Sequence, residues 1–252
     1  MRDWDQYLNS GLLVAVRLSG LMVFAPVFNS SAIAPRIKAG FVLALTILLA
    51  PVVGSVRGAS PELGVGSIGG ELGVGMVFGL SLMMLTEALL MAGTLLGMSF
   101  SFSLVNLLDP NTMVETPVLG QMLGWFGVLI IIGAGLDRVL LAAFVRSFCA
   151  VPVGQAVVQA HTGAALAGMA GGIFLSGLQL AAPVMAAALV VEVTVAMVNR
   201  LAPMLPAQVV GVPMKTLASY AVLTGSLAVW PGWIERHFAT LLDLAGKMLV
   251  RA

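Results

Sequence analysis

Long stretches without a single Asp, Glu, Lys or Arg constrain this chain more than any other feature of its sequence. A helix that crosses the roughly 30 Å hydrocarbon core of a bilayer needs about 20 mostly apolar residues. Backbone groups in lipid must find hydrogen bonds within the protein, which favours helices. The longest stretch, Ser147–Val191, exceeds one span and contains a polar break at Pro152–Gly163. These stretches predict about six long apolar helical segments, at about residues 11–34, 39–56, 65–104, 116–148, 164–199 and 207–234.

The composition also indicates an all-α integral membrane protein. Of the 252 residues, 60% are hydrophobic and 9% are charged, whereas soluble domains have about 45–50% apolar and about 25% charged residues. The high hydrophobicity and low charge argue against a soluble globular enzyme. They also argue against a disordered chain, which would have low hydrophobicity. A net charge of +1 gives no electrostatic reason to expect nucleic-acid binding. We expect one polytopic domain over residues 1–252, without a separate soluble domain and with its first apolar segment retained.

The sequence offers little for catalysis or metal binding. His161 and His237 lie far apart without metal-ligand spacing, and a single cysteine, Cys149, excludes an internal disulfide. A P-loop, a His-Glu-x-x-His motif and a Gly-x-Ser-x-Gly motif are absent from the sequence. Residues Gly64–Gly69 fit the Gly-x-Gly-x-x-Gly dinucleotide pattern, but no predicted strand precedes them. We therefore expect no enzyme activity, no cofactor and no metal site.

Four ionisable residues interrupt otherwise apolar segments: Arg17, Glu71, Glu87 and Glu192. Such a group deep in a span costs at least about 2.5–3.5 kcal/mol, so each should face protein or water. Arg17 could instead extend its charged end to the membrane interface. Glu192 could couple to an ion, or it could pair with Arg200, eight residues further along the same helix.

Glu87 shares a predicted helical face with several methionines, among them Met83 and Met91. Methionine side chains are flexible and suit surfaces that repack around varied contacts. This face is therefore either a deformable lining of a conduit or an ordinary packing face.

Glycine and proline are placed where helices must pack closely or break. Glycine pairs four residues apart, such as Gly75 and Gly79, let helix backbones approach each other. Pro26 and Pro183 lie within apolar stretches and should kink or interrupt their helices. Interrupted helices at membrane depth are tolerated where the freed backbone lines a cavity or is buried in protein. We expect a protein-lined path or close contact, either within the chain or with partner subunits.

Two polar, proline-containing loops follow apolar segments, Ser99–Pro117 and Asn199–Lys215. The order and spacing of several segments, including parts of these loops, resemble those of the FliR family of flagellar export-gate proteins. The counterpart of this family in virulence type III secretion is SctT. The pieces that carry the resemblance are Arg17–Pro26, Ala34–Gly40, Ser101–Pro117 with its Asp109-Pro110 turn, Asn199–Pro203 and Gly211–Lys215.

The resemblance implies a non-enzymatic core subunit in the bacterial inner membrane, within the flagellar basal body. It implies bent helical hairpins that assemble with FliP- and FliQ-like subunits into a closed hetero-oligomeric pore. FlhB- and FlhA-like proteins would lie next to this pore, and unfolded substrates would be exported through it.

The resemblance also assigns roles to residues. The central loop is implied to plug the pore, and the residues assigned to it are Ser101, Phe102, Asp109, Pro110, Thr116 and Pro117. Subunit or loop contacts are implied for Arg17, Arg36, Lys38, Asn199, Arg200, Pro203, Gly211, Pro213 and Lys215. Met83, Glu87 and Met91 are candidates for a face toward the lumen.

Two alternatives stay open at this point. One is the virulence counterpart, SctT, although overall likeness favours the flagellar system. The other is a small secondary transporter in which Glu87 and Glu192 are the coupling carboxylates. Internal repeats would support a transporter, and the two halves of the sequence show no convincing similarity.

Overall fold

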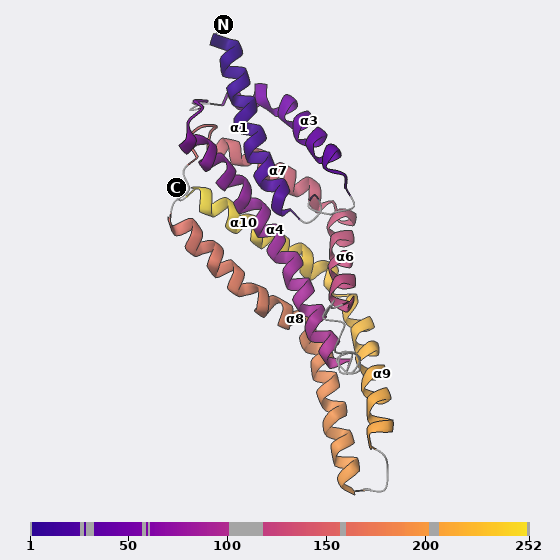
Figure 1. Ribbon diagram of the computed structural model, residues 1–252. Coiled ribbons are helices and arrows are strands. Elements are labelled where there is room, and N and C mark those ends of the chain that lie inside the picture. Colours follow the sequence, from indigo (N-terminus) through magenta and orange to yellow (C-terminus); the bar gives the residue numbers. More distant parts are fainter. Residues whose placement is uncertain are drawn as a thin grey trace, which may run out of the picture. The chain divides into compact units, whose positions relative to one another are not determined.

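In the computed structural model, the described elements are all α-helices (Figure 1). The structure describes residues 2–25, 28, 33–56, 59, 61–100, 118–156, 160–201 and 207–250. The helices are α1 (Arg2–Phe24), α3 (Pro35–Gly54), α4 (Val65–Ser99), α6 (Val118–Gly133), α7 (Leu136–Ala150), α8 (Ala160–Leu201), α9 (Ala207–Leu227) and α10 (Trp230–Val250).

The prediction of a helical membrane protein is confirmed. Within the described ranges, 4 helices are long and apolar enough to cross a membrane, and up to 6 spans result if each of two bent pairs forms one more. α1 begins at Arg2 and α10 continues to Val250, both beyond the predicted segments. The reason is that charged residues at the chain ends are helical, whereas the prediction followed charge-free stretches.

Two predicted segments, 116–148 and 207–234, are each broken into two helices. α6 and α7 are bent by 71°, and α9 and α10 by 57°. Gly135, between α6 and α7, has a φ of 68°, a left-handed conformation that glycine adopts without strain. Pro231 lacks the N–H that a helix continuing from α9 would need. In contrast, α8 continues through Pro183 as one helix, so of the predicted kink or interruption the interruption does not occur there, and Pro26 lies outside the described residues.

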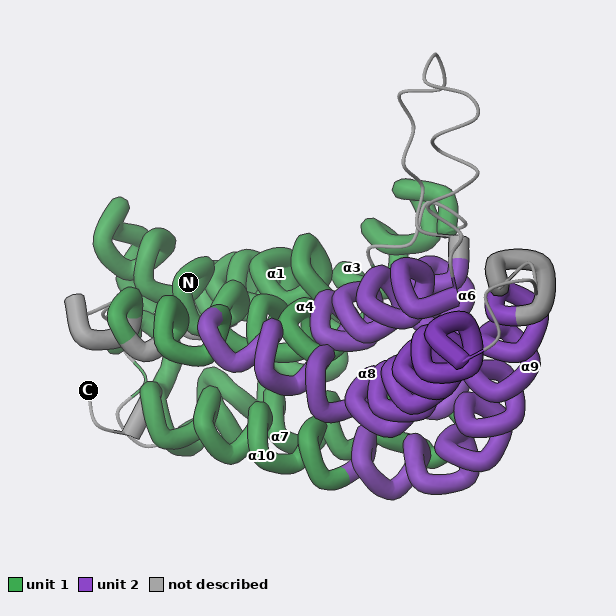
Figure 2. The backbone as a smooth tube through the Cα atoms, turned by 90° about the horizontal axis from the view of Figure 1, so that it is seen from below, with its two compact units in different colours: residues 1–85, 131–170, 236–252 green, residues 86–130, 171–235 purple. Residues whose placement is uncertain are grey.

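The chain divides into two compact units (Figure 2). Unit 1 consists of residues 1–85, 131–170 and 236–252, and unit 2 consists of residues 86–130 and 171–235. Helices α4, α6, α8 and α10 contribute residues to both units. The two units therefore share helices although each has its own core.

The core of unit 1 is built around aromatic side chains. Phe144 of α7 is fully buried, and its ring packs edge-on against Phe78 of α4 at 6.2 Å and against Phe148 at 5.5 Å between centroids. Leu18 of α1 and Phe238 of α10 are buried in the same unit. The rings join α4 to α7, because edge-on aromatic pairs are favourable beyond the area that they bury.

α3 differs from this core, although it lies beside α1 (Figure 1). Only 11% of its apolar span is buried, and Leu43, Ile47 and Leu48 are 58% to 67% exposed. A soluble monomer rarely exposes so large an apolar surface, so this face must be covered by lipid or protein.

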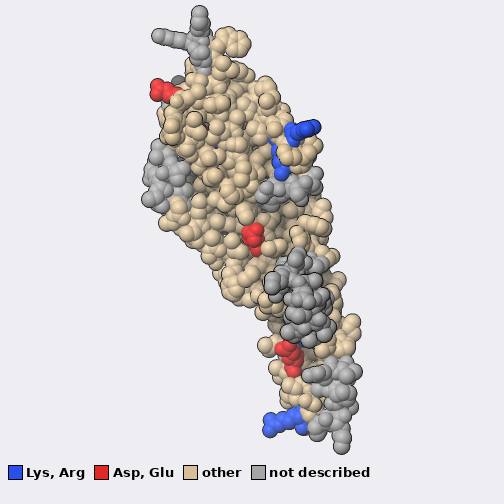
Figure 3. All heavy atoms as spheres, viewed as in Figure 1, with Lys and Arg blue, Asp and Glu red and all other residues tan. Residues whose placement is uncertain are grey.

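Unit 2 buries one side of the second half of α4, with Leu89, Ala92 and Leu96, against parts of α6, α8 and α9. Phe100, which follows α4, is buried, and its ring lies 4.5 Å from that of Tyr220 in α9. Only 17% of the apolar span in α8 is buried. Charged side chains are few on the face shown in Figure 3, as this apolar character requires.

Candidate functional site

A buried ion pair lies at the centre of the unit 1 polar contacts. The Nε atom of Arg17 in α1 lies 2.5 Å from Oε2 of Glu71 in α4, and both side chains are 0% exposed. Removing two charges from water costs several kcal/mol per ion, roughly, unless their remaining hydrogen-bonding groups are satisfied. The surrounding residues decide whether such a pair is stable.

The rest of the Arg17 guanidinium is satisfied by α7 and the loop after it. Its two terminal nitrogens donate to Oγ of Ser147 at 3.2 Å and to the carbonyl oxygen of Val151 at 3.0 Å. Its central carbon lies 4.2 Å from the centroid of the Phe148 ring, which adds a cation–π contact. A cation at the C-terminal end of α7 is also favoured by the helix dipole.

The second oxygen of Glu71 holds the loop between α7 and α8. Its Oε1 atom accepts a hydrogen bond from the backbone N–H of Gly154 at 2.9 Å. Gly154 has a φ of 84°, which side-chain-bearing residues rarely adopt. One carboxylate therefore binds α1 through Arg17 and the loop through Gly154. We call Arg17, Glu71, Ser147, Val151 and Gly154 the buried cluster.

Close backbone packing brings the cluster together. A Cβ atom at Gly75 would lie 2.0 Å from the carbonyl oxygen of Arg17, and one at Gly20 would lie 2.7 Å from that of Leu72. A Cβ atom at Gly70 would lie 1.7 Å from the carbonyl oxygen of Ala156. Gly20 and Gly75 let α1 approach α4, and Gly70 lets the α7–α8 loop approach α4. In the sequence of α4, Glu71 lies between Gly70 and Gly75. The glycine pair that includes Gly75 therefore packs within the chain.

A second ion pair joins α8 to α9 in unit 2. Lys215 Nζ donates to Oε1 of Glu192, and their side chains are 15% and 58% exposed. The two helices are also close at Gly211, where a Cβ atom would lie 3.0 Å from Val195. The predicted pairing of Glu192 with Arg200 is wrong, because eight residues along one helix separate two positions by about 12 Å.

The structure thus pairs Arg17 with Glu71, two residues that the sequence analysis noted separately. Arg17 and Glu71 were each conspicuous as charges within apolar segments, and Arg17 is buried rather than extended toward an interface. Ser147 and Gly154 were missed, since a serine in an apolar helix is unremarkable. Gly154 carried one signal, its place in the polar break of residues 152–163.

The face with Met83, Glu87 and Met91 is half-buried and lies opposite the buried side of α4. Met91 packs against α8, where a Cβ atom at Gly177 would lie 2.9 Å from its side chain. This contact with the same chain is what an ordinary packing face would show.

The other predicted site residues are dispersed. Arg36 and Lys38 lie in the first turn of α3, Asn199 and Arg200 are exposed at the end of α8, and Gly211 and Pro213 lie in α9. The predicted plug residues Ser101, Phe102, Asp109, Pro110, Thr116 and Pro117, together with Pro203, lie outside the described residues.

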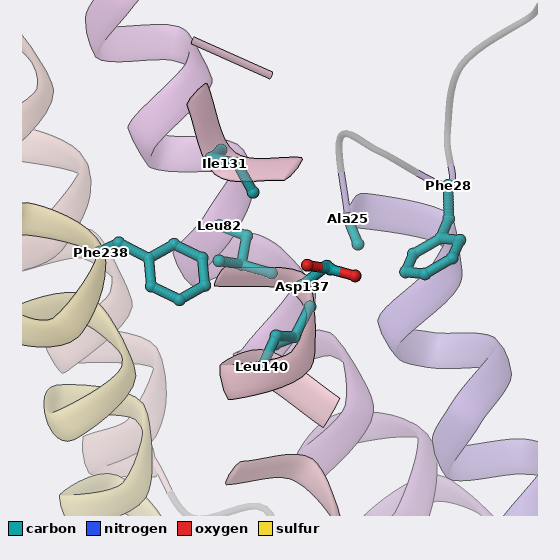
Figure 4. A pocket seen from close by; sticks show the side chains of 7 residues that line it. All are labelled: Ala25, Phe28, Leu82, Ile131, Asp137, Leu140 and Phe238. Carbon is teal, nitrogen blue, oxygen red and sulfur yellow. The ribbon is translucent and has the colours of Figure 1, made fainter. Parts of the chain in front are cut away.

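A small pocket in unit 1 does not resemble a substrate site. It has room for about one water molecule, and Asp137 of α7 lines it beside Ala25 and Leu140 (Figure 4). Among residues with described positions, no group of three or more His, Cys, Asp or Glu could hold a metal ion. The residues that line the pocket are Ala25, Phe28, Leu82, Ile131, Asp137, Leu140 and Phe238.

Comparison with known proteins gives one consistent result. The sequence model of the family described as "Bacterial export proteins, family 1" matches residues 8–241. The chain is similar to the flagellar biosynthetic protein FliR of Pectobacterium carotovorum, with 28% identity over 99% of this chain and 97% of the relative. It is 27% identical to FliR of Caulobacter vibrioides, over 92% of this chain and 94% of the relative. FliR of Bacillus subtilis is 26% identical, over 94% of this chain and 93% of the relative.

Proposed function

Because the chain belongs to the FliR family of bacterial flagellar export proteins, we propose that it is a core, non-enzymatic subunit of the flagellar type III export gate. In this proposal it assembles with FliP- and FliQ-like subunits into a closed pore for unfolded substrates. FlhB- and FlhA-like proteins lie next to the pore, in the bacterial inner membrane and the flagellar basal body.

The observation that carries the proposal is apolar surface that the chain leaves uncovered. α3 and α8 bury only 11% and 17% of their apolar spans within the chain, although the α4 span is 56% buried. Leu189, Val190 and Met197 of α8 are each about 60% exposed, as interface or lipid contacts would be. Helices of FliP- and FliQ-like subunits would cover these largely apolar faces.

We further propose that the segment from Ser101 to Val118 is the plug. It connects the end of α4 to the start of α6. Its start is fixed by Phe100, which is buried and packs on Tyr220. In this proposal the segment occludes the lumen until a substrate passes.

The assembly is tested by co-expressing the tagged chain with FliP- and FliQ-like proteins of the same organism and purifying the tagged chain in detergent. We expect a stable complex with more copies of the partners than of this chain, measured by native mass spectrometry. Leu43→Arg in α3 should reduce recovery of the partners, whereas Leu13→Ala in the core should weaken the fold instead. Recovery of the chain alone, folded and monodisperse, would contradict the proposal and favour an independent transporter.

The plug is tested by removing residues 104–115 from the co-expressed complex. Ion conductance across vesicles that contain the complex should rise, because the occluding segment is shortened. Unchanged conductance in a complex of normal composition would show that these residues do not close the pore.

A further inference from the structure

We propose that α7 lies along the membrane interface and binds anionic phospholipid headgroups. The binding surface is the outer face of α7, formed by Arg138, Val139, Ala142, Val145 and Arg146. This inference does not depend on the export function, because it concerns how unit 1 meets the bilayer.

The first argument is the change in sequence at the break between α6 and α7. α6 contains no charged residue in 16, whereas α7 contains Asp137, Arg138 and Arg146 in 15. Arg138 and Arg146 are eight residues apart, so they are separated by about 12 Å along the helix axis. If α7 crossed the bilayer, the two guanidinium groups would lie at different depths. If α7 lies along the interface, both reach the headgroups.

The second argument is that the core of unit 1 fixes which side of α7 faces outward. Leu140, Phe144 and Phe148 are 0% to 4% exposed and occupy the inner side. Arg17 also holds the C-terminal end of α7 through Ser147 and Val151. On the opposite side, Arg138, Ala142 and Arg146 are exposed, and Val139 and Val145 are 49% and 37% exposed.

The third argument is charge complementarity. The single acidic residue of α7, Asp137, lines the pocket with Ala25 and Phe28 and is not part of the outer face (Figure 4). The outer face therefore presents two arginines with small apolar side chains between them. Arginine donates bidentate hydrogen bonds to phosphate, and the valines suit contact with the upper acyl chains. This combination fits an anionic phospholipid of the bilayer interface, such as phosphatidylglycerol.

Cys149 allows a direct test, because it is the only cysteine of the chain and is exposed on the same side of α7. The full-length chain, labelled there with a fluorophore, is placed in vesicles of phosphatidylcholine with increasing phosphatidylglycerol. We expect nitroxides on lipid headgroups to quench the label more than nitroxides deep in the acyl chains. We also expect quenching to increase with phosphatidylglycerol.

The double variant Arg138→Gln/Arg146→Gln should need at least about fivefold more phosphatidylglycerol for half-maximal quenching, since each basic residue near an anionic surface contributes roughly fivefold. Arg138→Lys/Arg146→Lys should retain the dependence, and Arg200→Gln on α8 should leave it unchanged. Equal thermal stability of the variants in detergent checks that their fold is intact.

Three results would overturn the proposal. The first is quenching that does not depend on the phosphatidylglycerol content. The second is stronger quenching by nitroxides deep in the acyl chains than by nitroxides on the headgroups. The third is the same phosphatidylglycerol dependence in Arg138→Gln/Arg146→Gln as in the unmodified chain. Protection of the label in lipid-free detergent by co-purified partner proteins would assign this face to a protein instead. The three lipid results do not bear on whether the chain assembles into an export gate, whereas protection by partner proteins would overturn the lipid proposal and support assembly.

Discussion

Arg17 and Glu71 join two helices of unit 1, and Glu192 and Lys215 join two helices of unit 2, by the same kind of charge pair. The first pair is fully buried and shares its hydrogen bonds with three further groups, whereas Glu192 is 58% exposed. Removing one partner leaves an uncompensated charge in a fully enclosed site in the first case, and in the second a charge on a face of α8 that the chain itself leaves open. The comparison teaches that burial, rather than the presence of an ion pair, decides how much a helix contact depends on its charges.

Arg17→Ala should produce the largest effect. It leaves the Glu71 carboxylate buried without its partner, which costs about 3–5 kcal/mol in comparable proteins. The apparent melting temperature of the purified chain in detergent should fall sharply. Arg17→Met/Glu71→Leu should recover part of the loss, because it removes both charges. If the double variant were as unstable as the sum of single substitutions, the two side chains would not be coupled.

Gly75→Ala should come next, because it prevents the backbone approach that allows the buried pair to form. The new Cβ would lie 2.0 Å from the Arg17 carbonyl oxygen, so α1 must move away from α4. We expect a loss of about 1–3 kcal/mol in unfolding free energy, measured by thermal or denaturant unfolding in detergent. Gly69→Ala is the matched control in the same helix, since nothing lies within 4 Å of its position, and it should be neutral or stabilising.

Gly154→Ala should destabilise by about 1–2 kcal/mol, because its left-handed conformation is unfavourable for alanine. Gly135→Ala is the matched control. Gly135 also has a left-handed φ, of 68°, but nothing lies within 4 Å of a Cβ atom there, so the substitution does not touch the buried cluster. Hydrogen exchange at residues 151–156 separates the two variants. Exchange there should increase in Gly154→Ala and stay unchanged in Gly135→Ala. Equal exchange in both would mean that the Glu71 contact does not hold this loop.

Lys215→Met should have the smallest effect, at most about 1 kcal/mol, because its partner Glu192 is 58% exposed and ion pairs that are not enclosed contribute little. The melting temperature of the chain should change only slightly, and Lys247→Met, which breaks the exposed pair with Asp243, serves as the reference. If Lys215→Met lowered the melting temperature as much as Arg17→Ala, the two ion pairs would not differ in their contribution to stability. It would also show that the α8–α9 contact is covered in the purified protein.

Sequence reasoning predicted most of the helices, because apolar length is a local property that a bilayer requires. It missed the break at Gly135, since residues 116–148 read as one apolar segment and a left-handed glycine leaves no trace in hydropathy. It identified Arg17 and Glu71 as costly charges but not as partners. Their pairing across 54 positions depends on the glycine-mediated crossing of α1 and α4, which is a property of the fold.

The buried cluster also sets an order in time. Arg17 leaves the ribosome long before Gly154, and at roughly 5–20 residues per second the 137 residues from Leu18 to Gly154 take about 7–27 s to synthesise. During that interval the first helix has its arginine but not yet the full set of groups that satisfy it. The complete set of hydrogen bonds to Arg17 can therefore form only after the α7–α8 loop has been made.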